Sequence, residues 1–155
     1  MLLTPHILLG AAIGSKISSP AAIFALSFAS HYFLDALPHY EYKIPGLKGK
    51  VADNKKIFID FLKLAADFCF GAVLALFLVW NSPFRTGAVL GMLSALIPDA
   101  LLFLYWRHPD SKFLKLFALP HRACHFLNNL SPAWLGFSVE ALIGFATIFF
   151  LVYAI

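Results

Sequence analysis

The fold of this chain depends on the stretch Ser27-Phe-Ala-Ser-His31-Tyr-Phe-Leu-Asp35-Ala-Leu-Pro-His39. This stretch is largely apolar, and yet it carries side chains that can bind a metal. In a helix, residues four apart share one face, so Ser27, His31, Asp35 and His39 are expected side by side. An ionisable group at bilayer depth costs about 2.5–3.5 kcal/mol on insertion scales and usually faces a partner, a cavity or an ion. We therefore expect this face to line a site.

The composition is that of an integral membrane protein. Of 155 residues, 61% are hydrophobic and 13% are charged, and the mean hydropathy is +0.80. An average soluble domain is roughly 45–50% apolar and about 25% charged. We expect a single all-α transmembrane domain over residues 1–155, because the chain leaves no room for a separate soluble module.

Proline and serine clusters divide the chain into hydrophobic segments, and a full span needs about 20 apolar residues. We predict a polytopic helical bundle with four or five transmembrane helices and one interfacial or re-entrant helix. The predicted helices are about 4–15, 20–38, 57–80, 84–106, 112–128 (the interfacial one) and 133–155. The first of these is short for a span, but its small residues would let another helix approach closely. The polar segment 40–56 is predicted to be an exposed loop.

Basic residues set the expected orientation. The loops 39–56 and 107–132 fall on one face of the membrane and hold five and four Lys or Arg, whereas the opposite side keeps only Lys16 and Arg85. By the positive-inside rule the first face is cytoplasmic. We expect an integral protein of the inner (cytoplasmic) membrane with a cytoplasmic amino end. The positive charge indicates topology or lipid contact, so no nucleic acid is expected as a partner.

This topology gathers histidines and acids toward the cytoplasmic leaflet. The predicted metal ligands or their supporting residues are His6, His31, Asp35, Asp67, Asp99, His121 and His125. Imidazole together with carboxylate favours a divalent metal, zinc first, with manganese or iron as alternatives. His121 and His125 are four apart, as in zinc-peptidase helices, but Arg122 stands where a peptidase has its Glu base.

Structural explanations remain open for several of these side chains. Histidines can sit in interfacial loops, and acids can form hydrogen bonds with neighbouring helices. The residues concerned are His39 and His108 as loop histidines, Asp60 with Lys63 as a helix-surface pair, and Asp67, Asp99 and Glu140 as helix-to-helix partners.

Four pieces of the chain carry a resemblance to a known family: Thr4-Pro5-His6, Ser30-His31-Tyr-Phe-Leu-Asp35-Ala-Leu-Pro38, Leu96-Ile97-Pro98-Asp99 and His121-Arg122-x-x-His125. They resemble a family of small bacterial and archaeal membrane-bound metal-dependent hydrolases, loosely and over most of the chain. That family typically shows Leu-Pro-Asp-x-Asp-His. Here the second Asp and the His are absent, and the His-Arg motif is one residue shorter. The resemblance implies a metal-dependent hydrolase.

A second resemblance is to the superfamily of alkaline ceramidases and adiponectin receptors, which are seven-helix zinc hydrolases. Ser27-x-x-x-His31, Asp67 or Asp99, and His121-x-x-x-His125 match its parts. This chain has fewer helices than that fold. The resemblance nevertheless implies the same chemistry.

The favoured function is a hydrolase that acts on a lipid or another amphipathic ester, phosphoester or amide at the cytoplasmic interface. Asp35 or Asp99, whichever is not a ligand, would act as general base, and Ser27 would steady the oxyanion. Arg122 or a lysine of the 43–56 loop would hold an anionic headgroup. A metal-binding transporter or ion-binding protein is one alternative, although it would continue its polar residues through the outer leaflet. A membrane scaffold with basic cytoplasmic loops is another. A homo-oligomer is left open.

Overall fold

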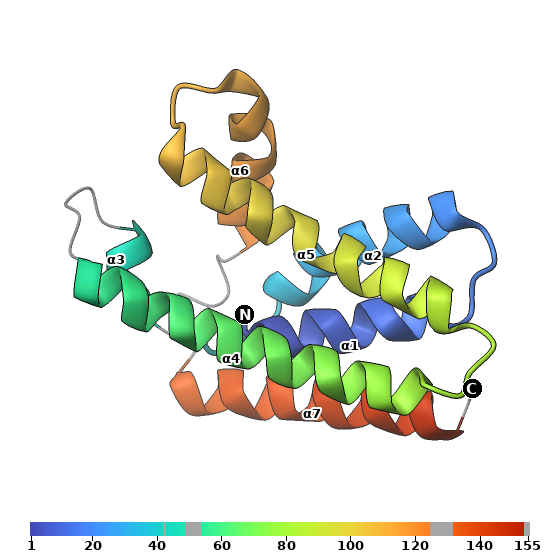
Figure 1. The fold of residues 1–155 in the computed structure, drawn as a ribbon. Coiled ribbons are helices and arrows are strands. Elements are labelled where there is room, and N and C mark those ends of the chain that lie inside the picture. The colour runs from blue at the N-terminus through green and yellow to red at the C-terminus, as the bar shows by residue number, and fades with distance from the viewer. Residues whose placement is uncertain (42, 49–53, 125–131, 154–155) are drawn as a thin grey trace.

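All secondary-structure elements in the described part of the chain are helices. The computed structural model describes residues 1–41, 43–48, 54–124 and 132–153 (Figure 1). The helices are α1 (Leu3–Gly14), α2 (Pro20–Asp35), α3 (Pro45–Lys48), α4 (Asn54–Val79), α5 (Arg85–Arg107), α6 (Lys112–Cys124) and α7 (Ala133–Tyr153). The predicted all-α class is confirmed.

Three of these helices are long and apolar enough to cross a membrane. They are α4, α5 and α7, with 26, 23 and 21 residues. Their presence indicates a membrane protein. The predicted four or five spans are not confirmed. A full span needs about 20 residues, whereas α1 has 12 residues and α2 has 16.

The shortest of the apolar helices, α1, lies at the centre of the bundle. It packs against α5, α4, α2 and α7 (Figure 1). Its side chains Ile7, Leu8 and Ala11 are almost completely buried, and they form one core with Ala75 of α4 and Ala88 of α5. A helix of 12 residues is only about 18 Å long, so side chains of the surrounding helices can contact both of its ends.

Glycines bring α1 and α5 into backbone contact. A Cβ atom on Gly10 would collide with the carbonyl of Gly91, and one on Gly14 would collide with the carbonyl of Gly87. Each helix thus contributes two glycines four apart, and the pairing is antiparallel. Small residues at membrane helix interfaces allow such close approach. This contact fixes the position of α1 along α5.

Two local differences from the predicted segments affect the site. Helix α2 begins at Pro20, behind Ser19, whose Oγ accepts a hydrogen bond from the amide of Ala22, and it ends at Asp35 instead of continuing to residue 38. The segment 40–56 is not a purely exposed loop, because it contains α3 with a buried Leu47. The carboxylate of Asp60 accepts hydrogen bonds from the amides that open this turn, which holds α3 against α4.

Candidate metal centre

Five buried or half-buried side chains from four helices meet at one end of the bundle. His6 comes from the first turn of α1, His31 and Asp35 come from the end of α2, Asp99 comes from α5, and His121 comes from α6. The first three and His121 are at most 4% exposed, whereas the Asp99 side chain is 34% exposed. All five are among the ligands predicted from the sequence.

Four nitrogen and oxygen atoms of this group face one another closely. His31 Nε2 lies 3.1 Å from Asp35 Oδ2 and 3.6 Å from Asp99 Oδ1. His121 Nε2 lies 3.6 Å from the same oxygen of Asp35 and 3.7 Å from the same oxygen of Asp99. His31 and His121 therefore face the same two carboxylate oxygens.

Each of these four separations fits a pair of ligands on one metal ion. A tetrahedral zinc site with bonds of about 2.0–2.2 Å has neighbouring donor atoms about 3.3–3.6 Å apart. The four measured distances run from 3.1 to 3.7 Å. Two imidazoles and two carboxylates form a donor set typical of zinc, and also of manganese or iron. We call these four residues, His31, Asp35, Asp99 and His121, the donor cluster.

The backbone of α5 orients the ring of His31. Nδ1 of His31 lies 2.8 Å from the carbonyl oxygen of Ala95, and since a carbonyl can only accept, Nδ1 carries the proton. Pro98 follows in the same helix, and a proline inside a helix removes one backbone hydrogen bond and loosens that turn. Nε2 of His31 is buried and makes no hydrogen bond of acceptable geometry, despite its two carboxylate neighbours. A neutral ring in this tautomer directs a lone pair into the donor cluster, as in metal sites whose second ring nitrogen donates to a carbonyl.

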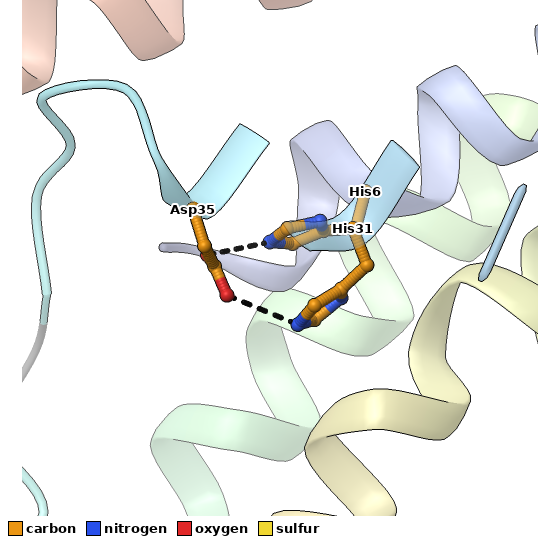
Figure 2. Close-up of side chains that lie close together, drawn as sticks. All are labelled: His6, His31 and Asp35. Carbon is orange, nitrogen blue, oxygen red and sulfur yellow. Dashed lines mark ion pairs between the residues drawn. The ribbon is translucent and has the colours of Figure 1, made fainter. Parts of the chain in front are cut away.

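His6 supports the other side of the Asp35 carboxylate. Its Nε2 lies 3.3 Å from Asp35 Oδ1, and its ring stacks on that of His31 with centroids 4.0 Å apart (Figure 2). The amino nitrogen of Met1 lies 3.4 Å from the same oxygen. His6, His31 and Asp35 could also hold an ion by themselves, since one donor atom of each lies within 4.8 Å of the others. Both carboxylate oxygens of Asp35 therefore have nitrogen neighbours: Oδ1 faces His6 and the amino group of Met1, and Oδ2 faces His31 and His121.

The thiol nearest to the cluster is Cys124, at the end of α6. Burial, together with the negative charge of Asp35, raises the pKa of this thiol. Cys124 belongs to neither group with metal-site spacing among the described residues, so the donors of those groups are imidazoles and carboxylates.

Asp67 lies outside the donor cluster and contacts another helix, which is the structural role that the sequence left open for it. Its carboxylate lies at the amino end of α1, where it accepts hydrogen bonds from the amides of Leu3 and Thr4, at 2.5 and 3.2 Å, and from the hydroxyl of Thr4 at 2.6 Å. Glu140 of α7 accepts one from the amide of Leu2, at 2.9 Å. Helix amino ends favour such negative charges. The two acids anchor α1 and thereby position His6, and neither joins a group with metal-site spacing among the described residues.

The remaining predicted residues have mixed outcomes. Ser27 is completely buried one turn before His31, and its hydroxyl has no hydrogen-bond partner among the described residues, but it is not part of the donor cluster. His125 lies outside the described residues. His39 contacts the Leu37 carbonyl and the Glu41 carboxylate, and His108 is exposed at the end of α5.

A cavity of about 720 Å³ adjoins the donor cluster. Asp99 and His121 form part of its wall, Arg122 lies beside them, and most of the other lining side chains are apolar. No sequence pattern could predict this cavity, because its walls come from α1, α4, α5, α6 and the segment around α3.

Comparison with known proteins adds nothing to this picture. No family model, curated protein or solved structure matches the chain. The resemblance to membrane-bound metal-dependent hydrolases therefore stays a prediction based on the quoted motifs.

Proposed function

We propose that this protein is a membrane-bound, metal-dependent hydrolase. The observation that carries the proposal is the donor cluster, in which two histidines and two aspartates from three helices converge beside a largely apolar cavity. An enzyme needs such a site to be open to a substrate on one side. Asp99 supports this reading, since it belongs to the cluster and to the cavity wall.

His31, Asp35 and His121 would hold the ion, which we propose to be zinc, with manganese or iron as alternatives, and a fourth position would stay open for water. The bound ion would supply Lewis acidity, which activates water and polarises the bond to be broken. His6 would keep Asp35 in place through the second carboxylate oxygen. The buried ring of His31 would stay in one tautomer through Ala95.

Asp99 is the better candidate for the general base. A base must reach the proton that it removes, directly or through one water. Asp35 is 1% exposed and enclosed by histidines, whereas Asp99 is partly exposed and borders the cavity. Asp99 would then be the aspartate of the donor cluster that is not a ligand, and it would take the proton from the water. Ser27 has no contact that supports the predicted oxyanion role.

We propose that the substrate is a lipid or another amphipathic ester, phosphoester or amide. Of the helices in the described part of the chain, only α4, α5 and α7 have the length of full spans, so α1 and α2 would form a hairpin inserted between them, with the donor cluster at the cytoplasmic end. The donor cluster and the more basic loops would then lie on the same side of the membrane as the amino terminus. Reporter fusions in the segment 49–53 and at residue 155 test this orientation, which predicts opposite sides of the membrane.

Metal analysis of the purified protein tests the centre itself. The wild type is expected to carry about one divalent ion per chain, and His121→Ala and Asp35→Asn are expected to lose it. The matched controls are His108→Ala and Asp110→Asn, because both residues are exposed and lie outside the donor cluster. Equal metal content in all five proteins would refute the site.

Hydrolysis is tested separately. The protein is incubated with membrane lipid extracts and zinc or manganese, and products are followed by mass spectrometry. Turnover should disappear with a chelator and in Asp99→Asn, and should persist in Asp110→Asn. Turnover that survives chelation would exclude the metal from the reaction.

A further inference from the structure

The cavity beside the donor cluster has one charged side chain that pairs with no described residue. Arg122 lines the cavity next to His121, and the structure contains no hydrogen bond or ion pair from its guanidinium to another described residue. The other charged side chain outside the cluster, Glu41, lies 3.1 Å from His39 Nε2. The amino group of Met1, which also lines the cavity, faces Asp35 at 3.4 Å, so among the described residues Arg122 is the cation available to a headgroup.

The apolar part of the cavity lies between α4 and α5. Leu64 of α4 faces it from one side, and Leu96, Leu102, Phe103 and Trp106 of α5 line the other. The two helices meet at the turn 80–84 and diverge toward the end that carries the donor cluster (Figure 1). Both helices have the length and composition of membrane spans. If they cross the bilayer, the cavity between them would be open to the apolar chain of a lipid.

We infer that the cavity binds an anionic amphiphile, with its apolar chain between α4 and α5 and its negative headgroup beside Arg122. The binding of the amphiphile is inferred from the cavity and Arg122. Which group of the amphiphile would react depends on the proposed function. A volume of about 720 Å³ is within the range of small-molecule sites, about 300–1,000 Å³. An arginine binds phosphate or carboxylate through two parallel hydrogen bonds. The two carboxylates of the lining already have described partners, because Asp99 faces His31 and His121 and Glu41 faces His39, so Arg122 is the charged side chain left to meet a headgroup.

Binding is measured by calorimetry on the purified full chain in the presence of a chelator, so that neither turnover nor a bound metal contributes. The probe is dodecyl phosphate, with dodecyltrimethylammonium as the cationic chain of equal length. Dodecyl phosphate is expected to bind at least about tenfold more tightly than the cationic probe. Equal affinities for the two probes would overturn the inference.

Variants test whether the headgroup binds at Arg122 and whether the apolar chain binds in the apolar part of the cavity. Arg122→Gln should weaken dodecyl phosphate binding about tenfold, while Arg122→Lys should retain part of the affinity. Lys115→Gln is the matched control, because Lys115 is exposed on the same helix and does not line the cavity. Ala100→Phe should weaken dodecyl phosphate more than hexyl phosphate, because it fills the apolar part. Wild-type affinity in Arg122→Gln, or an equal effect of Lys115→Gln, would refute the role of Arg122.

A further experiment distinguishes two possible occupants of the cavity, a lipid of the bilayer and a soluble anionic amphiphile. The protein is placed in phosphatidylcholine nanodiscs with or without phosphatidic acid. Competition between phosphatidic acid and dodecyl phosphate identifies a bilayer lipid as the occupant, and lack of competition identifies a soluble anionic amphiphile. If Arg122-dependent binding is found without any hydrolysis, the proposed enzyme fails while this inference stands. If hydrolysis is found without Arg122-dependent binding, the reverse holds.

Discussion

The imidazole of His31 donates its Nδ1 proton to the carbonyl oxygen of Ala95, across 2.8 Å between α2 and α5. This hydrogen bond decides which ring nitrogen faces the donor cluster. Nε2 is left to meet Asp35 and Asp99, at 3.1 and 3.6 Å. Ala95 lies in the same turn of α5 as Pro98, so a backbone group of one helix contacts a ligand on another.

Pro98→Ala should therefore weaken metal binding. Alanine restores an amide at position 98, which can bond to the Ser94 carbonyl and tighten the turn. The Ala95 carbonyl and Asp99 then shift, and loss of such supporting contacts typically costs 10–100-fold in metal affinity. Zinc affinity is measured by titration against a chromophoric chelator. An unchanged zinc Kd, in a variant that is folded by circular dichroism, would show that this turn does not prepare the site.

Asp67→Asn should leave the metal in place and lower stability. The carboxylate caps α1, and loss of a helix cap with its favourable charge typically costs about 0.5–2 kcal/mol. Thermal unfolding in detergent should show a lower Tm, while metal content stays at the wild-type value. Asp110→Asn, on the surface, serves as control. Loss of metal without loss of stability would instead return Asp67 to the ligand set.

Gly91→Ala should separate α1 from α5. The added Cβ would overlap the Gly10 backbone, and backbone atoms cannot move aside as a flexible side chain does. We expect a lower Tm. Because α1 carries His6, which contacts Asp35, we also expect a lower metal affinity. Gly144→Ala in α7 is the matched control, since nothing lies within 4 Å of its new Cβ. Equal behaviour of the two variants would contradict the close packing of α1 on α5.

Removal of the metal should destabilise the wild type only. A ligand that binds the folded state alone stabilises it by about 2.7 kcal/mol at a concentration 100 times its Kd. Chelation should lower the Tm of the wild type, and added zinc should restore it. Asp35→Asn should respond to neither treatment. Since histidine binds metal only when neutral, the zinc effect should fade as the pH falls. A zinc-dependent Tm in Asp35→Asn would remove Asp35 from the centre.

Local patterns were enough to predict the helices and part of the site. The four-residue spacing of His31 and Asp35 sets both on one face wherever α2 lies, and the length and apolarity of α4, α5 and α7 follow from the sequence alone. The small residues of α1 likewise predict a close helix neighbour. These features depend on helix geometry and composition, which are properties of a single segment.

Only the tertiary structure distinguished one acid from another. In the sequence, Asp67 and Asp99 look alike, because each is an aspartate within an apolar helix. In the fold, Asp67 meets the amino end of α1, and Asp99 meets His31 and His121. Helical periodicity fixes the face on which a side chain lies, but the neighbour that this face meets depends on how α1 packs against α4 and α5. The sequence by itself thus determined the helices and the residue types available for chemistry, and helix packing decided which of them became caps and which became donors.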